Sequence, residues 1–333
     1  MSKIMIPWVE KYRPNRLDEV VMPKKKLLLL REFFQQDDFP NFLFFGPPGV
    51  GKTSCISACA QEYYGKADLH GQCLELNASD DRGIDVVRTK IKDFTNSRWS
   101  LRSLESSRSD GTNVPTTRKP KLIILDEVDG ISPLAQSALL VEMENNMENA
   151  RFCLICNDVN KLNLAILSRC LRLRFSPLTR EQISERLTSI ALAESLHIDE
   201  SGISAIVELS KGDMRSALNV LQQMSLTQTS TITETDVYKA MSIPLPQEIV
   251  DLVSFVRDHS IRESFTKIYT FALENGYDAN TITNAFHMYF LTRDNAVVLS
   301  CLAKIETRIA NECTLKIQLG YLVATLKQNF KTE

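Results

Sequence analysis

The feature that most constrains the fold of this chain is the segment LFFGPPGVGKTS at residues 43–54. Gly46, Gly51, Lys52 and Thr53 satisfy the pattern G-x-x-x-x-G-K-[ST], directly after the apolar run FLFF and before a helical pattern. In that setting the loop backbone curls around phosphates, the lysine reaches the outer phosphates, and the threonine hydroxyl ligates Mg²⁺ at the helix N-terminus. The segment therefore predicts a strand–loop–helix unit that binds a nucleotide with Mg²⁺.

Short apolar runs predict a parallel sheet around this unit. They alternate with helical patterns, and near-continuous apolar strands of this kind are typical of sheets covered by helices on both faces. The sequence therefore predicts an α/β domain at residues 1–176, interrupted by a Ser-, Thr- and Arg-rich exposed loop at 97–120. The expected strands are 42–45, 73–77, 122–125, 152–156 and 171–175.

Beyond the α/β domain the strand patterns stop and amphipathic helices follow. Thr179 and Gln182 have the spacing of a helix capping box, and Asn275-Gly276 has the composition of a helix stop. The segment IPLP at 243–246 reads as a linker. We therefore expect a helical lid domain at 177–242 and an all-α domain at 247–333.

Composition limits the class of protein. Hydrophobic residues make up 44% of the 333 and charged residues 24%. No apolar run reaches the roughly 18 residues of a membrane span, and the N-terminus lacks a secretory pattern, so we expect an intracellular protein with no membrane partner. The net charge of −2 argues against a general nucleic-acid binder. Cys153 and Cys156 have C-x-x-C spacing, but their apolar surroundings favour buried thiols over a zinc site.

Two carboxylates and an amide follow the predicted strands. Asp126 ends the run KLIILD, where its carboxylate can hold Mg²⁺ through water, and Glu127 beside it is placed to deprotonate an attacking water. Asn157 ends the run RFCLICN and can bond that water or a γ-phosphate, although asparagine at a strand end is more commonly a turn residue. Two solvated carboxylates at the surface are the alternative. After a phosphate loop, this set favours a nucleotide hydrolase.

These motifs, in this order, resemble the small subunits of replication factor C, the AAA+ sliding-clamp loader. WVEKYRP, GPPGVGKTS, LNASDDRGIDVVR, LDEVD, ICN, LSRC and GDMRSALNVLQ carry the resemblance, which runs from about residue 7 to residue 221. The details are most similar to the small subunits numbered five in animals and three in budding yeast. The resemblance implies a AAA+ P-loop domain with a parallel sheet, a helical lid, and an all-α collar domain that holds a ring of subunits together.

The resemblance also implies ATP and Mg²⁺ as ligands and gives roles to single residues. Asn157 matches sensor 1, and Arg215 in GDMR matches sensor 2, a cation that touches the γ-phosphate. Arg169 in SRC matches an arginine finger, which serves the nucleotide site of the adjacent subunit. The catalytic set is then Lys52, Glu127, Asn157, Arg169 in trans, and Arg215, with Thr53 and Asp126 on the metal. The nucleotide-binding set is Val9, Tyr12, Arg13, Pro14, Gly46, Pro47, Pro48, Gly49, Val50, Gly51, Lys52, Thr53, Ser54, Asn157 and Arg215.

DNA contacts are implied for the helix expected in GIDVVRTKIKDF. In the family this helix follows the template backbone, which points here to Arg82, Arg88, Lys90 and Lys92. Such phosphate contacts depend on salt and are indifferent to base sequence. An exposed helix held by its own salt bridges is the alternative. The chain also departs from the family, since LLVEM at 139–143 replaces two arginines of the usual A-L-R-R pattern.

The sequence is compatible with three functional hypotheses. The first is an ATPase subunit of a nuclear hetero-pentamer, with one large and three further small subunits, that loads a ring-shaped clamp on primer–template DNA. The second is a non-hydrolysing scaffold subunit of the same assembly that donates Arg169 to its neighbour. The third is a branch-migration motor, for which a C-terminal winged helix is expected, whereas only amphipathic helices are found there.

Overall fold

The computed structural model describes residues 6–35, 39–78, 84–96, 119–226, 231–293, 295–311 and 314–332. The side chains of residues 84–88, 315, 331 and 332 are outside this description. Arg82 and residues 97–118 of the expected loop therefore lie outside the described residues, as does the side chain of Arg88.

The centre of the N-terminal part is a five-stranded parallel sheet in the order β2-β3-β4-β1-β5. Each expected strand is present, so the prediction of a parallel α/β sheet is confirmed. The strands are β1 (Phe42–Phe45), β2 (Cys73–Asn77), β3 (Lys121–Asp126), β4 (Ala150–Cys156) and β5 (Leu171–Arg174).

The register brings the functional strand ends to one edge of the sheet. Phe45 at the end of β1 pairs with Cys156 at the end of β4, and Asn77 at the end of β2 pairs with Asp126 at the end of β3. Because all the pairs are parallel, the segments that follow β1, β3 and β4 leave the same edge. This places the phosphate loop, Asp126 and the residue after Cys156 beside one another.

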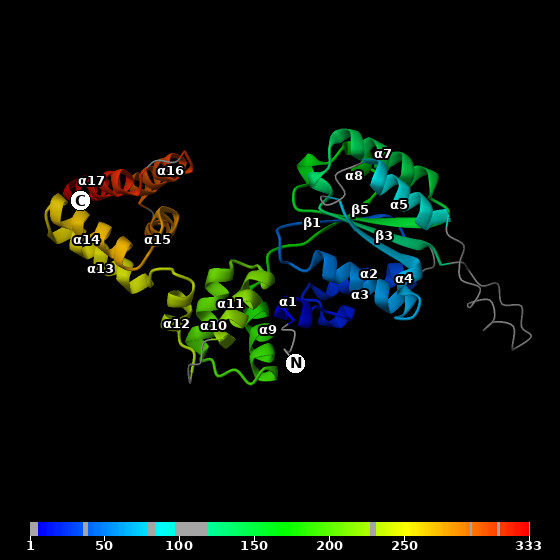
Figure 1. Cartoon of the computed structure of the whole chain (residues 1–333), viewed down its shortest axis with the longest axis horizontal. Coiled ribbons are helices and arrows are strands. Elements are labelled where there is room, and N and C mark those ends of the chain that lie inside the picture. Colours follow the sequence, from blue (N-terminus) through cyan, green and yellow to red (C-terminus); the bar gives the residue numbers. More distant parts are fainter. Residues whose placement is uncertain are drawn as a thin grey trace, which may run out of the picture. The chain divides into compact units, whose positions relative to one another are not determined.

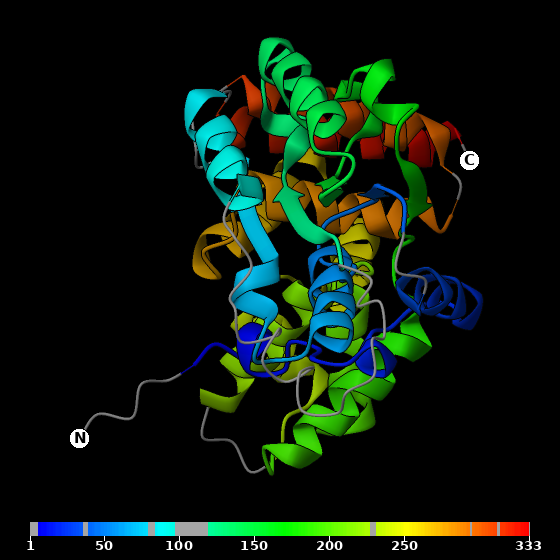
Figure 2. The same cartoon turned by 90° about the vertical axis from the view of Figure 1, so that its right-hand side faces the viewer.

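Helices cover both faces of the sheet. Phe42 and Phe44 of β1 belong to a buried cluster with α2 (Lys24–Gln35) and α3 (Lys52–Tyr64). Leu43 between them belongs to a second cluster on the opposite face, with α5 (Ile84–Asn96), α7 (Pro133–Asn145) and α8 (Leu164–Leu167). The two helical layers are visible above and below the strands (Figures 1 and 2). Burial on both faces explains why the three central strands β1, β3 and β4 are apolar at almost every position, whereas the edge strands β2 and β5 carry the exposed charges Glu75, Arg172 and Arg174.

The other helices of the described residues up to 226 are short or belong to the expected lid. They are α1 (Trp8–Lys11), the 3₁₀ turns η1 (Leu17–Glu19), η2 (Val128–Gly130) and η3 (Val159–Lys161), α4 (Leu69–Gln72), α9 (Arg180–Ala193), α10 (Glu200–Ser210) and α11 (Met214–Leu226).

Two expected helix boundaries, one before α9 and one at the end of α14, are present in the structure. The N–H of Thr179 donates to Gln182 Oε1 at 3.0 Å and the N–H of Gln182 to Thr179 Oγ1 at 3.4 Å, which confirms the capping box before α9. Gly276 ends α14 at a φ of +67°, a conformation in which glycine is unstrained. The last helices are α12 (Glu234–Ala240), α13 (Pro246–Asp258), α14 (Ile261–Glu274), α15 (Ala279–Leu291), α16 (Ala296–Ala310) and α17 (Leu315–Thr332).

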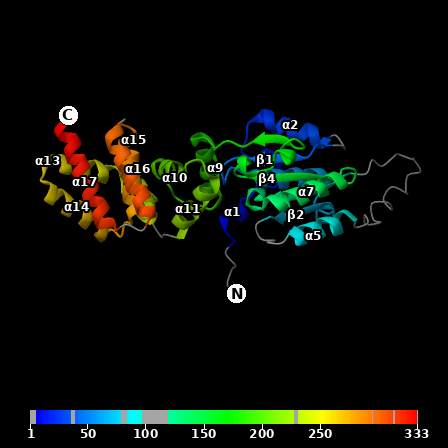
Figure 3. The ribbon, with the colours of Figure 1, turned by 90° about the horizontal axis from the view of Figure 1, so that it is seen from above.

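The chain divides into two compact units. The N-terminal unit comprises residues 1–190 and 207–222, and the C-terminal unit comprises 191–206 and 223–333, so the boundary passes through α9, α10 and α11. In the C-terminal unit, α13 to α17 pack around a core of their own that includes Phe286, Leu302 and Leu322. Figure 3 shows these five helices. Among the described residues, no helix combines the length and apolarity that a membrane span requires.

Candidate nucleotide site

The phosphate loop lies between β1 and α3 and is shaped by glycines. Gly49 and Gly51 have φ values of +67° and +87°, in the left-handed region that side-chain-bearing residues rarely adopt. At Gly49 space is also closed, since a Cβ there would stand 1.6 Å from Asp213 Oδ1. At Gly51 no atom of the described residues would lie within 4 Å of a Cβ. Glycine at position 49 is therefore required both by its backbone angle and by the start of α11.

Lys52 opens α3 and turns its side chain beneath the loop. Its ammonium donates to Gly46 O and Pro47 O, both at 2.7 Å, and to Asn157 Oδ1 at 2.9 Å. Only 7% of Lys52 is exposed, and this burial lowers the pKa of its ammonium, while the Asp126 carboxylate opposes the shift. Lys52 therefore bridges the phosphate loop and the end of β4.

Two oxygen ligands for a hard cation meet next to Lys52. The hydroxyl of Thr53 donates to Asp126 Oδ2 at 2.6 Å, and the other oxygen, Oδ1, accepts the N–H of Glu127 at 2.8 Å. A hydroxyl and a carboxylate are ligands that Mg²⁺ prefers, so the pair fits the predicted metal. Glu127 itself is exposed and has a φ of +55°. The chain therefore turns directly after Asp126, and both residues line the same cavity.

Asn157 is positioned by a carboxylate that the sequence analysis did not select. Asp129 Oδ2 accepts the N–H groups of Asn157 at 3.3 Å and of Asp158 at 3.2 Å. Asp129 lies in η2, immediately after the expected catalytic strand end. It therefore ties the end of β4 to the turn that follows β3. The acidic composition of LDEVD was the available signal, but the partner of its last carboxylate was not evident.

A cavity of about 410 Å³ collects these groups. The predicted residues that line it are Val9, Tyr12, Arg13, Pro14, Pro48, Gly49, Val50, Gly51, Lys52, Thr53, Ser54, Asp126, Glu127, Asn157 and Arg215. Gly46 and Pro47 of the nucleotide-binding set are not among the lining residues; their carbonyls hold Lys52 instead. Lining residues that the sequence analysis missed are Glu10, Glu75, Arg186, Met214 and Leu218, among others.

The N-terminal side of the cavity is fixed by polar contacts to distant segments. Arg13 lies 3.5 Å from Glu10 and 3.7 Å from Glu75 of β2. The guanidinium of Arg186, in α9, donates to the carbonyl of Tyr12 at 3.1 Å. These residues come from three separate parts of the sequence. Only the fold brings them to one wall, which is why Arg186 had no sequence signal.

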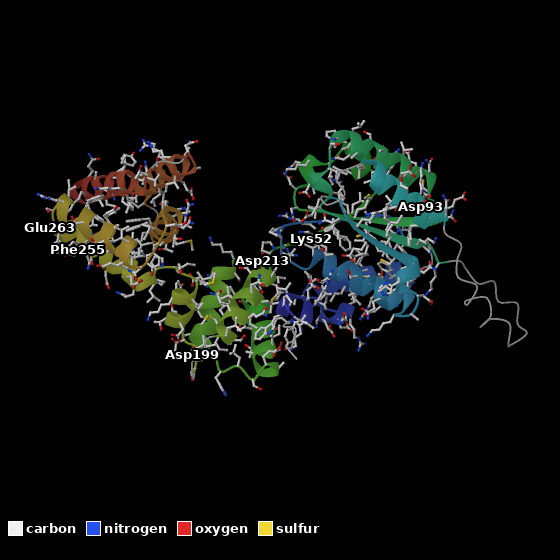
Figure 4. All side chains as sticks on the ribbon, viewed as in Figure 1. Lys52, Asp93, Asp199, Asp213, Phe255 and Glu263 are labelled. Carbon is white, nitrogen blue, oxygen red and sulfur yellow. The ribbon has the colours of Figure 1, made fainter. Side chains whose placement is uncertain are left out.

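The start of α11 touches the phosphate loop directly. The N–H of Met214 donates to Gly49 O at 3.1 Å, and Asp213 Oδ1 accepts the N–H groups of Arg215 at 2.7 Å and Ser216 at 3.1 Å. Figure 4 labels Asp213 and Lys52, which belong to these two neighbouring segments. The cap orients the first turn of α11, so Arg215 starts next to the loop and lines the cavity.

Arg169 lies apart from this cavity. Its guanidinium makes an ion pair with Glu144 at the end of α7, with Nη2 2.6 Å from Oε1, and donates to Ala165 O at 3.0 Å. It is not among the residues that line the cavity.

The expected DNA-contacting lysines lie on α5 and are both exposed. Lys92 Nζ is 3.6 Å from Glu142 Oε1 of α7, and only 2% of the Glu142 side chain is exposed. Glu142 belongs to the helix segment that replaces the family's two arginines. Lys92, one of the two lysines expected to contact DNA, therefore forms an ion pair with the buried carboxylate of Glu142.

Known families match three consecutive stretches of the chain. Residues 42–178 match the ATPase family associated with various cellular activities (AAA), 180–237 match the RFC1-like AAA+ ATPase lid domain, and 244–325 match the replication factor C C-terminal domain. The parallel sheet, lid and helical C-terminal region expected from the sequence are therefore those of a AAA+ protein.

Curated relatives match almost the whole chain. A probable replication factor C subunit 5 of Caenorhabditis elegans is 37% identical over 96% of this chain and 86% of its own length. Replication factor C subunit 5 of Mus musculus is 36% identical over 97% and 92%, and subunit 3 of Schizosaccharomyces pombe is 37% identical over 98% and 92%. A solved structure of the RuvB Holliday junction branch migration motor of Thermotoga maritima has a TM-score of 0.51, covering 85% of this chain and 91% of that one. At 17% identity, that likeness is one of fold alone.

Proposed function

The chain belongs to the replication factor C small-subunit family, and from this premise we propose that it is an ATP-hydrolysing subunit of a sliding-clamp loader. ATP binding and hydrolysis would open a ring-shaped clamp and load it on primer–template DNA. The assembly would be a hetero-pentamer with one large and three further small subunits, working in the nucleus. The observation that carries this proposal is the hydrogen-bonded set formed by Lys52, Thr53, Asp126 and Asn157 around one cavity.

In this proposal each group of the set has one task. Lys52 leaves the loop carbonyls to bind the β- and γ-phosphates, for which its buried ammonium is already desolvated. Thr53 and Asp126 would hold Mg²⁺, which when bound would neutralise part of the phosphate charge. Glu127, next to the metal ligand and open to solvent, takes the proton of the attacking water.

Two further groups orient the reaction. Asn157 already contacts Lys52, so its amide is near the place that the γ-phosphate would take. Arg215 would add a positive charge from the start of α11, and because that helix also hydrogen-bonds Gly49, closure of the lid would follow occupancy of the loop. Val9, Tyr12, Arg13 and Pro14 would enclose the adenine from the N-terminal side.

The site remains incomplete in this account without a neighbour. Among the residues that the structure describes, no arginine other than Arg13, Arg186 and Arg215 lines the cavity. The finger would come from an adjacent subunit, and Arg169 would serve the next site in the ring, a contribution of about 10³–10⁵ in rate in comparable enzymes. Turnover is therefore expected only in the assembly.

DNA contact through α5 is also part of the proposal. Lys90 and Lys92 are exposed on that helix and would bind phosphates without reading bases. The pairing of Lys92 with Glu142 and the replacement of the usual arginines by Leu140 and Val141 reduce the positive charge of this face. We expect a weaker share of DNA affinity from this subunit than from its neighbours.

A non-hydrolysing scaffold role is the second candidate function. Arg169 is ion-paired with Glu144 outside the nucleotide cavity, so its role can be tested separately from that of Glu127. The experiment compares wild type, Glu127→Gln and Arg169→Ala in the reconstituted assembly, measuring ATP hydrolysis stimulated by clamp and primed DNA. Loss of turnover in both variants, with Glu127→Gln still binding ATP, supports a hydrolysing subunit that also activates its neighbour. If only Arg169→Ala lowers turnover, the phosphate loop is a structural ATP holder and the scaffold role is correct.

A further inference from the structure

Arg169 is held by a specific carboxylate within its own chain. Its Nη2 lies 2.6 Å from Glu144 Oε1, the distance of a charge-assisted hydrogen bond. A second bond, from Nη1 to Ala165 O at 3.0 Å, fixes the direction of the guanidinium plane. The two side chains are 43% and 42% exposed, so the pair can open without unfolding its surroundings.

Helix α7, which carries Glu144, also holds the segment that precedes Arg169. Gln136 of α7 is 3% exposed, and its amide donates to Lys161 O at 2.9 Å and accepts the N–H of Asn163 at 2.7 Å. Asn163 in turn caps α8, since its Oδ1 accepts the N–H of Ala165 at 3.0 Å. One end of the 161–169 segment is therefore fixed to α7 by a buried amide, and the other end by an exposed ion pair. Of the two ties, only the one at Arg169 is readily released.

We propose that Glu144 is a positioning residue that holds Arg169 in a stand-by state and competes for it with the phosphate charge of the neighbouring subunit's nucleotide. This inference rests on the proposed role of Arg169 in trans. Glu144 uses the Nη2 edge of the guanidinium, which is then not free to make a bidentate contact with phosphate oxygens. A triphosphate carries more negative charge than one carboxylate, so it can displace Glu144, whereas an empty neighbouring site cannot.

The strength of the pair sets the size of the effect. Exposed ion pairs stabilise by up to about 1 kcal/mol, which corresponds to a shift of up to about five-fold in the equilibrium between the paired and released states. Glu144 therefore weakens engagement of Arg169 by at most about five-fold. Such a contact delays the finger until the neighbour is loaded without blocking it afterwards. Salt screens exposed pairs, so the difference is expected to fade as ionic strength rises.

The first arm of the test measures the pair in the full-length chain alone. Phenylglyoxal modification of Arg169, followed by mass spectrometry, is compared in wild type, Glu144→Gln and Glu148→Gln. Glu148 is a matched control, because it is an exposed glutamate just after α7 and forms no ion pair with a residue that the structure describes. We expect Glu144→Gln to raise the modification rate up to about five-fold and Glu148→Gln to leave it unchanged. Equal rates in all three proteins would overturn the proposal.

The second arm measures competition in the reconstituted assembly. Glu144→Gln should lower the ATP concentration for half-maximal hydrolysis by up to about five-fold at low salt, with maximal turnover unchanged. A fall in maximal turnover like that of Arg169→Ala would show that Glu144 orients the working finger, and the stand-by role would be refuted. If Arg169→Ala itself changes nothing, the role in trans fails, and the competition fails with it. The labelling arm does not depend on that role, so the two failures are distinguishable.

Discussion

Gly49→Ala tests whether the phosphate loop and α11 are mechanically joined. A Cβ at this position would stand 1.6 Å from Asp213 Oδ1 and 2.1 Å from its Cγ. The Asp213 carboxylate cannot simply turn away, because it holds the N–H groups of Arg215 and Ser216 at 2.7 and 3.1 Å. The substitution must therefore either break this cap or separate the loop from the helix.

The free-energy cost of Gly49→Ala has two parts, backbone strain and a steric conflict with Asp213. Comparison with Gly51→Ala separates them. Alanine at the positive φ of either glycine costs about 1–2 kcal/mol. Gly51→Ala should cost only that amount, since no described atom lies within 4 Å of its Cβ position. Gly49→Ala adds a steric conflict of about 1–3 kcal/mol, for a total of about 2–5 kcal/mol. The difference between the two variants is the part due to Asp213.

The assay is urea unfolding of the nucleotide-free chain, followed by tryptophan fluorescence. Trp8 is 7% exposed and belongs to the N-terminal unit, so in a Trp99→Phe background its signal reports the unit that contains the loop. Asp213→Ala alone should cost about 1 kcal/mol as a lost helix cap. In the double variant with Gly49→Ala the two costs should fall short of their sum by about 1–3 kcal/mol. Equal costs for the two glycine variants, or full additivity with Asp213→Ala, would refute the reasoning.

Three further predictions concern the ends of strands and helices. Asp129→Ala should lower turnover in the assembly by up to about 10²-fold with little change in ATP affinity, because the backbone of Asn157 loses its hydrogen-bond acceptor. Asp129→Asn keeps an acceptor and should keep most of the activity, so equal losses of the two variants in steady-state kinetics would contradict this. At about 100 times its Kd, Mg-ATP should stabilise wild type by about 2.7 kcal/mol in thermal unfolding, and Lys52→Ala should not be stabilised; a comparable shift in the variant would argue against the role given to Lys52. Ser260→Ala should destabilise the C-terminal unit by about 1 kcal/mol at neutral pH, since Ser260 caps α14 and pairs with Glu263. Hydrogen bonds from the Ser260 hydroxyl and N–H also lower the pKa of the Glu263 carboxyl, so the part of the stabilisation that depends on the ionised carboxylate is present above the ordinary glutamate pKa of about 4.3 and is lost as the pH falls through the lower folded value. An effect of Ser260→Ala that stays constant down to about pH 2 would exclude this linkage.

The sheet was predictable because burial on both faces makes the central strands apolar at almost every position. Residues 152–156 and 42–45 are apolar throughout, and both runs are strands in the structure. The errors are at strand ends. β3 begins one residue earlier than expected, at Lys121, whose charge concealed a buried position. Its ammonium donates to Phe94 O at 2.5 Å and lies over the Phe94 ring at 4.9 Å. Such a contact to α5 depends on tertiary structure and has no local pattern.

The residues proposed to touch phosphate were predictable for a different reason. A loop that binds phosphates with its backbone restricts residue types at fixed spacing within one short segment, so Gly51, Lys52 and Thr53 identify themselves. Glu142 shows the opposite case. Nothing in the sequence marks this glutamate as buried, yet it is almost fully buried against α5 and paired with Lys92, fifty positions away. Periodicity assigns a face to a residue but not the partner that makes burial of a charge tolerable.

The supporting side chains are all carboxylates, but they hold two kinds of partner. The kind of partner determines how each one should respond to substitution. Asp129 and Asp213 each accept two backbone N–H groups at the end of a strand or the start of a helix, a task that a neutral amide oxygen also performs. Glu144 instead holds a guanidinium, where the negative charge supplies most of the interaction. Replacement by the matching amide should therefore preserve the first two contacts and release the third. If Asp129→Asn and Asp213→Asn are as harmful as the alanine variants, the negative charge of these two residues matters and not only their acceptor oxygens. If Glu144→Gln has no effect, the negative charge of Glu144 does not hold Arg169.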